Sequence, residues 1–169
     1  RELGGHEREV YTVVFHRSGQ WLLSGDLDGK IHQWEVATGK LVRSFDAAPL
    51  HKYEGGQEVH YGGIRGLVLS PDAKWLVAGG LHKATNPLGN VQEPLAMRFE
   101  WESAKAVKNH LTDGNPNETL WGLCYHPEGA VVGCIGGNKG QLVFWNETDE
   151  KPFHVHALPN SARGLALHS

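Results

Sequence analysis

The residue types of a hydrolytic triad, His6, Ser24 and Asp28, occur near the start of the chain. A serine hydrolase needs its hydroxyl and its imidazole about 3 Å apart at an open cleft, with a carboxylate that orients the imidazole. The sequence contains no G-x-S-x-G motif, which forms the turn that exposes a nucleophilic serine in one large class of hydrolases. The sequence therefore does not favour hydrolysis, which stays open as an alternative.

The chain contains 11 histidines, which raises the question of a metal site. His154 and His156 lie two residues apart, so on a strand their side chains would share one face and could supply half of a site. No Cys, Asp or Glu is placed by the sequence to complete that half-site. We therefore predict no metal site and no cofactor, and a metal-dependent lyase that uses histidines is a further enzymatic alternative.

The elements that must position these residues repeat along the chain. The 22 Gly and 6 Trp residues are typical of short strands that turn back on one another. A strand, a polar turn and a second strand follow one another over residues 10–25. The same outline returns over residues 64–80 and 120–137, and residues 162–167 begin a fourth copy. This pattern predicts an all-β fold built from antiparallel hairpins.

A third strand follows each complete hairpin and ends in a tryptophan, at Trp34, Trp101 or Trp145. A fourth, more polar strand follows it, at residues 41–45, 104–111 and 153–158. Periodicity alone would also allow a helix over residues 104–111, and the repeat decides for a strand. Four strands in about 40 to 45 residues are typical of one propeller blade.

We therefore predict a single partial β-propeller over residues 1–169, made of four-stranded antiparallel blades. The predicted blades cover about residues 4–47, 48–111 and 112–160, and residues 161–169 start a further blade. Closed propellers have about 4 to 8 blades. The sequence thus predicts a fragment that is completed by the remainder of a longer propeller, and self-association of such arcs is the alternative.

The first repeat has a defined order of residues: Gly5-His6, Val10, Val13, Phe15, Gly19, Ser24-Gly25, Asp28-Gly29, Ile31 and Trp34-Glu35. This order resembles, without a gap, the G-beta-type repeat of the WD-repeat β-propeller family. Glu35 is the one departure, since Asp is usual there. The later units keep their hairpins and end at Trp101-Glu102 and Trp145-Asn146.

The resemblance implies a structural tetrad of hydrogen-bonded side chains at His6, Ser24, Asp28 and Trp34. Such groups must satisfy one another when buried, because each unpaired group costs about 1 to 3 kcal/mol. The parts of this set that recur in the later units are His60, Trp101 and Trp145. We therefore expect apolar packing to replace the polar network there.

The insertions between the repeats fall on one rim. In propellers of this resemblance, the fourth-to-first and second-to-third strand loops share a rim, and residues 51–61, 81–94 and 112–119 lengthen loops of that kind. Loops on a rigid scaffold usually carry recognition. The predicted partner-binding residues are His51, Tyr53, His60, Tyr61, His82, Lys83 and Asn86. The alternative is that these loops only cover the edges of irregular blades.

The overall composition excludes several classes of protein. With 16 Lys and Arg against 19 Asp and Glu, the formal charge of −3 provides no bulk field that attracts nucleic acid or an acidic membrane surface. No apolar run reaches the roughly 18 residues that span a bilayer. We expect a soluble chain that is cytoplasmic by default. We also expect it to be cut from a longer protein, because the sequence opens with Arg1 rather than Met and no signal segment follows.

Cys124 and Cys134 lie on adjacent predicted strands of one hairpin. We expect packed thiols there, while a cross-strand disulfide stays open. Taken together, the sequence predicts a non-catalytic scaffold that binds a protein or peptide through its loop-rich rim. The alternatives are a propeller hydrolase or lyase, and a purely structural segment of a larger multidomain protein.

Overall fold

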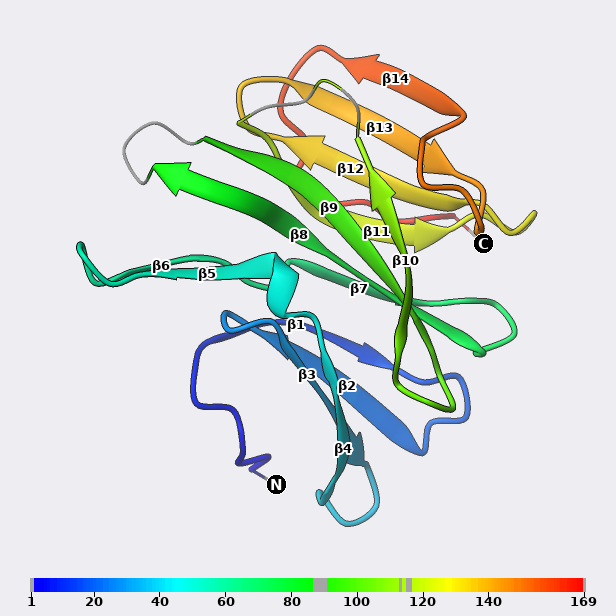
Figure 1. The fold of residues 1–169 in the computed structure, drawn as a ribbon. Helices are drawn as coiled ribbons and strands as arrows, with labels where there is room; N and C mark the ends of the chain where they lie inside the picture. Colours follow the sequence, from blue (N-terminus) through cyan, green and yellow to red (C-terminus); the bar gives the residue numbers. More distant parts are fainter. Residues whose placement is uncertain (1, 87–90, 113, 115–116, 169) are drawn as a thin grey trace.

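The structure is a computed structural model that describes residues 2–86, 91–112, 114 and 117–168. Three antiparallel sheets of four strands make up most of this part of the chain, each a meander in chain order (Figure 1). Blade 1 contains β1 (Val10–Phe15), β2 (Trp21–Asp26), β3 (Lys30–Glu35) and β4 (Leu41–Asp46). Blade 2 contains β7 (Gly66–Leu69), β8 (Trp75–Asn86), β9 (Val91–Glu100) and β10 (Ala106–Leu111). Blade 3 contains β11 (Thr119–Tyr125), β12 (Val131–Gly136), β13 (Gly140–Trp145) and β14 (His154–Leu158).

The predicted all-β fold of four-stranded antiparallel blades is confirmed, because every neighbouring pair within a blade is antiparallel. The segment that periodicity left open between helix and strand is the strand β10, which pairs with β9. The blades follow one another as an open arc in Figure 1, with the first strands β1, β7 and β11 as neighbours.

Two of the predicted long loops are strands in the structure. The short 3-10 helix η1 (Ala48–Leu50) leads into β5 (His51–Glu54), which pairs with β6 (Val59–Gly62) to form a separate two-stranded hairpin. The second insertion extends β8 and β9 far beyond the rest of blade 2, and pairing continues to Asn86 and Val91. Both hairpins project from the same side of the arc, the left side of Figure 1.

Residues 162–167, the predicted first strand of a further blade, form no strand in the structure. This segment passes close to blade 3, since a side chain at Gly122 would lie 3.1 Å from the backbone nitrogen of Leu165. A strand needs a partner for its backbone groups. Among the described residues this segment has no such partner.

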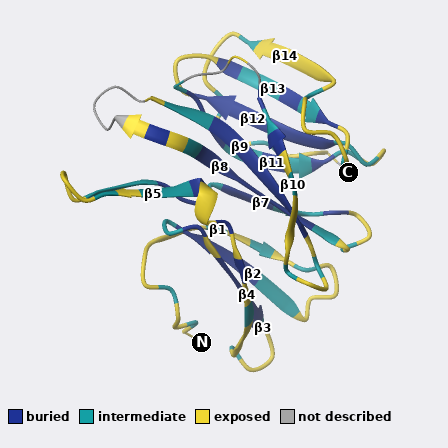
Figure 2. Cartoon of the chain, in the orientation of Figure 1, coloured by how far each residue is buried: buried dark blue, intermediate teal, exposed yellow. Residues whose placement is uncertain are grey.

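The core lies between the blades. Because side chains alternate along a strand, Leu76 faces blade 1 while its neighbour Val77 faces blade 3. The rings of Phe45 and Phe99 meet edge to face between blades 1 and 2, with centroids 5.9 Å apart. The second cluster, between blades 2 and 3, includes Val77, Ala96, Leu120, Ile135 and Trp145. Figure 2 shows these buried strand centres, while β14 and the tips of the turns stay exposed.

The strand register corrects one of the predicted repeat tryptophans. In each blade, the last residue of the first strand pairs with a residue of the second strand, and that residue pairs in turn with a residue of the third strand. This chain of pairs defines the equivalent position in the three blades. These second- and third-strand pairs are Leu22 with Trp34, Leu76 with Phe99, and Val131 with Trp145. Phe99, not Trp101, is therefore the equivalent of Trp34. Trp101 follows the end of β9, and its ring stacks on His16 with a centroid distance of 4.7 Å.

None of the described residues forms a helix that is both long enough and apolar enough to cross a bilayer.

Candidate functional site

A network of polar side chains lies on the face of blade 1 that is turned away from blade 2. His6 Nδ1 is 2.6 Å from Asp26 Oδ2, and His6 Nε2 is 2.6 Å from Ser24 Oγ. Trp34 Nε1 donates to the same Ser24 oxygen at 2.7 Å. Every group is satisfied when His6 Nδ1 donates to the carboxylate and Ser24 donates its hydroxyl hydrogen to Nε2.

The carboxylate of this network is Asp26, so the prediction of Asp28 was wrong. Ser24 and Asp26 lie two residues apart on β2 and therefore share a face. Asp26 is 2% exposed, and its Oδ1 also accepts the backbone N–H of Lys30 at 2.8 Å. The strand ends at Asp26, and the following turn aims Asp28 away from His6 toward the β5–β6 hairpin. The structure thus brings together His6, Ser24 and Trp34 of the predicted tetrad.

Ser24 is enclosed by its neighbours. The residue is 5% exposed, and its oxygen already takes part in both hydrogen bonds described above. His32 stacks on His6 with ring centroids 4.0 Å apart. Burial, and then the neighbouring His6, lowers the pKa of His32.

The polar network does not recur in the later blades within the described residues. By the strand register, the position of Ser24 is taken by Ala78 in blade 2 and Gly133 in blade 3. In blade 3 the indole of Trp145 instead donates to the backbone oxygen of Leu111 at 2.8 Å. Apolar packing therefore replaces most of the network.

The predicted partner-binding residues lie on the two projecting hairpins. His51 and Tyr53 belong to β5, His60 and Tyr61 to β6, and His82, Lys83 and Asn86 to β8. The side chain of Asn86 lies outside the described residues. We call the surface formed by the β5–β6 and β8–β9 hairpins the hairpin rim.

The hairpin rim offers exposed aromatic and charged groups. Tyr53 is 51% exposed, and its ring lies against His60 with a centroid distance of 4.6 Å. On the other hairpin, Lys83 Nζ is 2.9 Å from Glu93 Oε2, and His82 Nε2 is 3.4 Å from the same oxygen. Burial lowers the pKa of His82, with Lys83 as the next cause.

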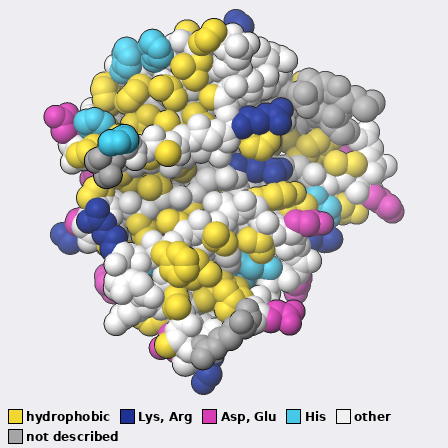
Figure 3. Space-filling view, turned by 180° about the vertical axis from the view of Figure 1, so that it is seen from behind, with side chains coloured by type: hydrophobic (Ala, Val, Ile, Leu, Met, Phe, Trp, Pro, Cys, Tyr) yellow, Lys and Arg dark blue, Asp and Glu magenta, His cyan; other side chains and the backbone are white. Residues whose placement is uncertain are grey.

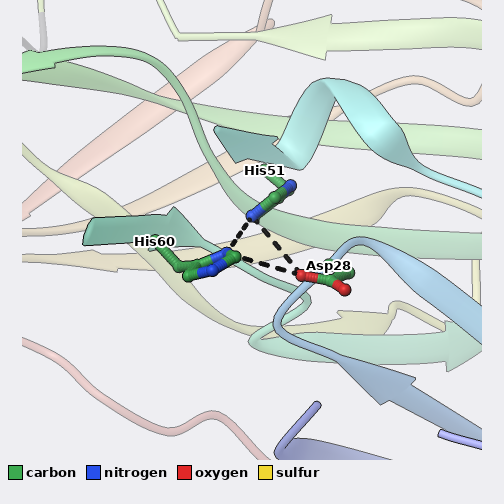
Figure 4. A group of neighbouring side chains, drawn as sticks. All are labelled: Asp28, His51 and His60. Atoms are coloured by element: carbon green, nitrogen blue, oxygen red, sulfur yellow. Dashed lines mark hydrogen bonds and ion pairs between the residues drawn. The ribbon is translucent and has the colours of Figure 1, made fainter. Parts of the chain in front are cut away.

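Asp28, His51 and His60 form a group of metal-ligating side chains that the sequence reasoning missed (Figure 4). Asp28 Oδ1 lies 3.5 Å from His51 Nε2 and 3.6 Å from His60 Nδ1. The two imidazole nitrogens are 2.9 Å apart. Burial is the largest cause that lowers the pKa of His51, and the Asp28 carboxylate opposes it. The residues come from separate segments, and Asp28 was assigned to the tetrad, so no local motif indicated the group.

The other predicted half-site does not resemble this group. His154 and His156 are both exposed on β14. They do not belong to the ligand group found among the described residues.

A row of alternating aromatic and cationic residues runs across the first strands of the blades. The Arg65 guanidinium lies 3.8 Å from the ring centre of Tyr11 and 5.5 Å from that of Trp121. Arg163 approaches the other side of the row, 5.6 Å from the Trp121 ring. Figure 3 shows cationic side chains beside hydrophobic ones on the face seen from behind. The sequence held a signal for this row, because each member directly follows the residue that opens a repeat.

Cys124 and Cys134 are both free thiols. They are not opposite one another, since Cys134 pairs with Gly122 and Cys124 pairs with Val132. Burial raises the pKa of both thiols, which keeps them protonated and poorly nucleophilic.

Comparisons with known proteins agree with this architecture. The family model described as "WD domain, G-beta repeat" matches residues 1–35. Protein HIR1 of Eremothecium gossypii is 28% identical over 171 residues, which cover 90% of this chain and 20% of that protein. The nuclear distribution protein nudF of Emericella nidulans is 28% identical over 182 residues, which cover 99% of this chain and 37% of that protein. The chain therefore spans only a fifth to about a third of these relatives.

A solved structure supports the same fold. The β-propeller domain of Cps50 (Swd1) from Myceliophteria thermophila superposes with a TM-score of 0.60 at 18% sequence identity. The superposition covers 91% of this chain and 40% of that chain. Residues 1–35 thus match the repeat of the WD-repeat family, and the chain has a partial β-propeller fold of three successive blades.

Proposed function

We propose that this chain is a non-catalytic scaffold that binds a protein or peptide through the hairpin rim. WD-repeat propellers generally serve as protein-interaction scaffolds, which supports the broad assignment. The single observation that carries the finer proposal is that both elaborated hairpins project from the same rim (Figure 1). The turns of the opposite rim are short, so recognition elements concentrate on one side.

The hairpin rim has the chemistry of an interface. Tyr and His rings combine contact area with a polar edge, and Tyr is enriched where proteins meet. Tyr53 presents its ring in the open, while Lys83 and Glu93 supply opposite charges on the neighbouring hairpin. A peptide could therefore be held by stacking and by charged hydrogen bonds at once.

The absence of a catalytic role is part of the proposal. Ser24 is 5% exposed and so lies at no open cleft, and burial raises the pKa of both thiols. The partners of the chain are proteins or peptides rather than nucleic acid or membrane, because its formal charge of −3 provides no field that attracts either of these. The rest of a longer propeller, or a second arc, would complete the ring; sedimentation of the chain separates these two arrangements.

The test compares matched aromatic truncations on the two rims. Tyr53→Ala removes a ring that is 51% exposed on the hairpin rim, and Phe153→Ala removes one that is 57% exposed just before β14, on the opposite rim. Quantitative affinity purification with the wild-type chain identifies partners, and calorimetry with a purified partner measures affinity. We expect Tyr53→Ala to weaken binding at least tenfold, the size of a moderate interface residue, and Phe153→Ala to leave it unchanged.

A second variant addresses the structural alternative. Deletion of residues 81–94 removes the extended part of the β8–β9 hairpin and, with it, half of the hairpin rim. Loss of partner binding with intact folding supports the proposal. Retention of every partner after this deletion and after Tyr53→Ala contradicts it, and favours a purely structural segment.

A further inference from the structure

We propose that Asp28, His51 and His60 form a Zn²⁺ site that fastens the β5–β6 hairpin to the β2–β3 turn of blade 1. Two imidazoles and one carboxylate are ligands that suit Zn²⁺, whereas Mg²⁺ and Ca²⁺ prefer oxygen alone. The three ligand atoms come from two elements that are far apart in the sequence, so a bound ion would link them (Figure 4).

The spacing of the ligand atoms fits a tetrahedral ion. Zn²⁺ bonds of about 2.0 to 2.1 Å require ligand atoms about 3.3 to 3.4 Å apart at a tetrahedral centre. The three observed separations, 2.9, 3.5 and 3.6 Å, bracket this value. Shifts of a few tenths of an ångström in the side chains would bring all three atoms to the required distances.

The Asp28 carboxylate also points to a bound cation. Its Oδ1 atom is buried and has no hydrogen-bond partner among the described residues. The two imidazole nitrogens face this oxygen at more than hydrogen-bond distance from it, and they are occupied with one another. A buried acceptor without a partner costs free energy. A cation between the three atoms would satisfy this oxygen.

The backbone holds the site in place on both sides of Asp28. The N–H of Ile64, just after the hairpin, donates to the oxygen of Asp26 at 3.0 Å. The N–H of Ala47, just before it, donates to the oxygen of Gly29 at 2.8 Å. The turn and the hairpin are therefore joined before any ion arrives, and little ordering is needed for binding.

Glycines make this close approach possible. Gly29 has a φ of +76°, and a side chain there would lie 2.6 Å from the oxygen of Ala47. Gly63 has a φ of +88°, and a side chain there would lie 2.8 Å from the Cα of Leu27. The packing of the hairpin against the turn thus depends on these two positions.

Binding requires no redox or covalent step. In the hydrogen bond between the histidines, one ring nitrogen carries a proton and the other accepts it. For both nitrogens to bind Zn²⁺, the donor histidine moves this proton to its other ring nitrogen through solvent, so no net proton is released from neutral rings. The three residues leave the fourth tetrahedral position to water, as in zinc sites with three protein ligands.

The test is a titration of the metal-free chain with Zn²⁺ against a fluorescent chelator. We expect one equivalent to bind, and excess Mg²⁺ not to displace it. Asp28→Asn and His60→Gln should each weaken the affinity at least tenfold. His82→Gln is the matched control, because it changes a partly buried histidine beside a carboxylate on the neighbouring hairpin, and should leave the affinity unchanged.

Two further measurements keep the test decisive. Visible absorption of the Co²⁺-substituted chain should show the intense bands of four-coordinate cobalt. Free Zn²⁺ at a hundredfold excess over its Kd should raise the melting temperature by roughly 5 to 10 °C in the wild type and not in the variants. Thermal melting in the presence of a chelator shows whether each variant folds. If His60→Gln does not fold, Asp28→Asn alone provides the test.

Two outcomes overturn the proposal. One is the absence of stoichiometric Zn²⁺ binding by the wild-type chain. The other is unchanged Zn²⁺ affinity in both Asp28→Asn and His60→Gln, with loss in His154→Gln, which would assign the ion to the exposed pair on β14. Neither outcome bears on the proposed partner binding, because Zn²⁺ is measured without a partner and the rim is tested through Tyr53.

Discussion

The two neighbouring carboxylates of blade 1 allow a sharp test of the polar network. Asp26→Asn and Asp28→Asn make the same chemical change two residues apart. Asp26 accepts two hydrogen bonds, from His6 Nδ1 at 2.6 Å and from the backbone of Lys30 at 2.8 Å. An asparagine keeps one acceptor oxygen and turns an amide toward the other donor. One hydrogen bond to a charged group, about 1.5 to 3 kcal/mol, is therefore lost.

Asp28 makes no comparable contribution in metal-free buffer. Its Oδ1 accepts no hydrogen bond, and its ion pair with Arg8 involves a side chain that is 46% exposed. Such exposed pairs contribute about 0 to 1 kcal/mol. His51 and His60, at 3.5 and 3.6 Å, form ion pairs with Asp28 only when they are protonated. We therefore expect Asp26→Asn to lower the melting temperature by about 3 to 12 °C, and Asp28→Asn by less than about 4 °C, at 2 to 4 °C per kcal/mol for a chain of this size.

Thermal unfolding in the presence of a chelator measures both melting temperatures, and urea unfolding measures the free energies of unfolding. The fluorescence of the 6 tryptophans reports the transition, and an unchanged slope licenses a comparison of midpoints. The wild-type chain and both variants should have the same far-UV spectrum. Equal destabilisation by the two variants, or a larger effect of Asp28→Asn, would refute our assignment of Asp26 to the network.

Three further predictions concern buried side chains and the residues beside the first strands of the blades. Burial lowers the pKa of His110, so the unfolded chain binds a proton on this side chain more readily and stability falls as the pH drops below about 6.5. His110→Asn keeps a donor for the backbone oxygen of Asp149 and should make the urea midpoint depend less on pH between pH 5 and 7.5. Phe99→Ala should cost about 3 to 5 kcal/mol in urea unfolding, and a larger cost for Trp101→Ala would contradict the register assignment. Arg65→Met should lower the free energy of unfolding by about 1 to 3 kcal/mol. The absence of a measurable loss would mean that the row of aromatic and cationic residues does not stabilise the fold.

Much of the fold follows from local patterning. The hairpin over residues 10–25 and its third and fourth strands were predicted within a residue or two, because alternating apolar residues and glycine turns are read locally. The hairpin over residues 51–62 was predicted as a loop. Its strands have four residues each, too few for alternation to distinguish them from a polar loop.

The error at Trp101 has a different physical origin. A shift of two residues along a strand leaves every side chain on the same face, so the apolar pattern cannot distinguish Phe99 from Trp101. Only the cross-strand partner decides, and that partner is Leu76. The choice between Asp26 and Asp28 is of the same kind, since both are an even number of residues from Ser24. There the end of β2 decides, because the turn no longer follows the alternation of the strand.

The Asp28 group shows why a site can escape sequence analysis while the fold does not. Its histidines stand near opposite ends of an insertion, and nothing in their spacing refers to the turn between β2 and β3. What brings them together is the pair of backbone hydrogen bonds that join Ala47 and Ile64 to that turn. Such bonds carry no residue-type signal, because any residue except proline can donate them. The place of the hairpin is therefore set by backbone geometry, and the chemistry at its base depends on which side chains that geometry brings within reach.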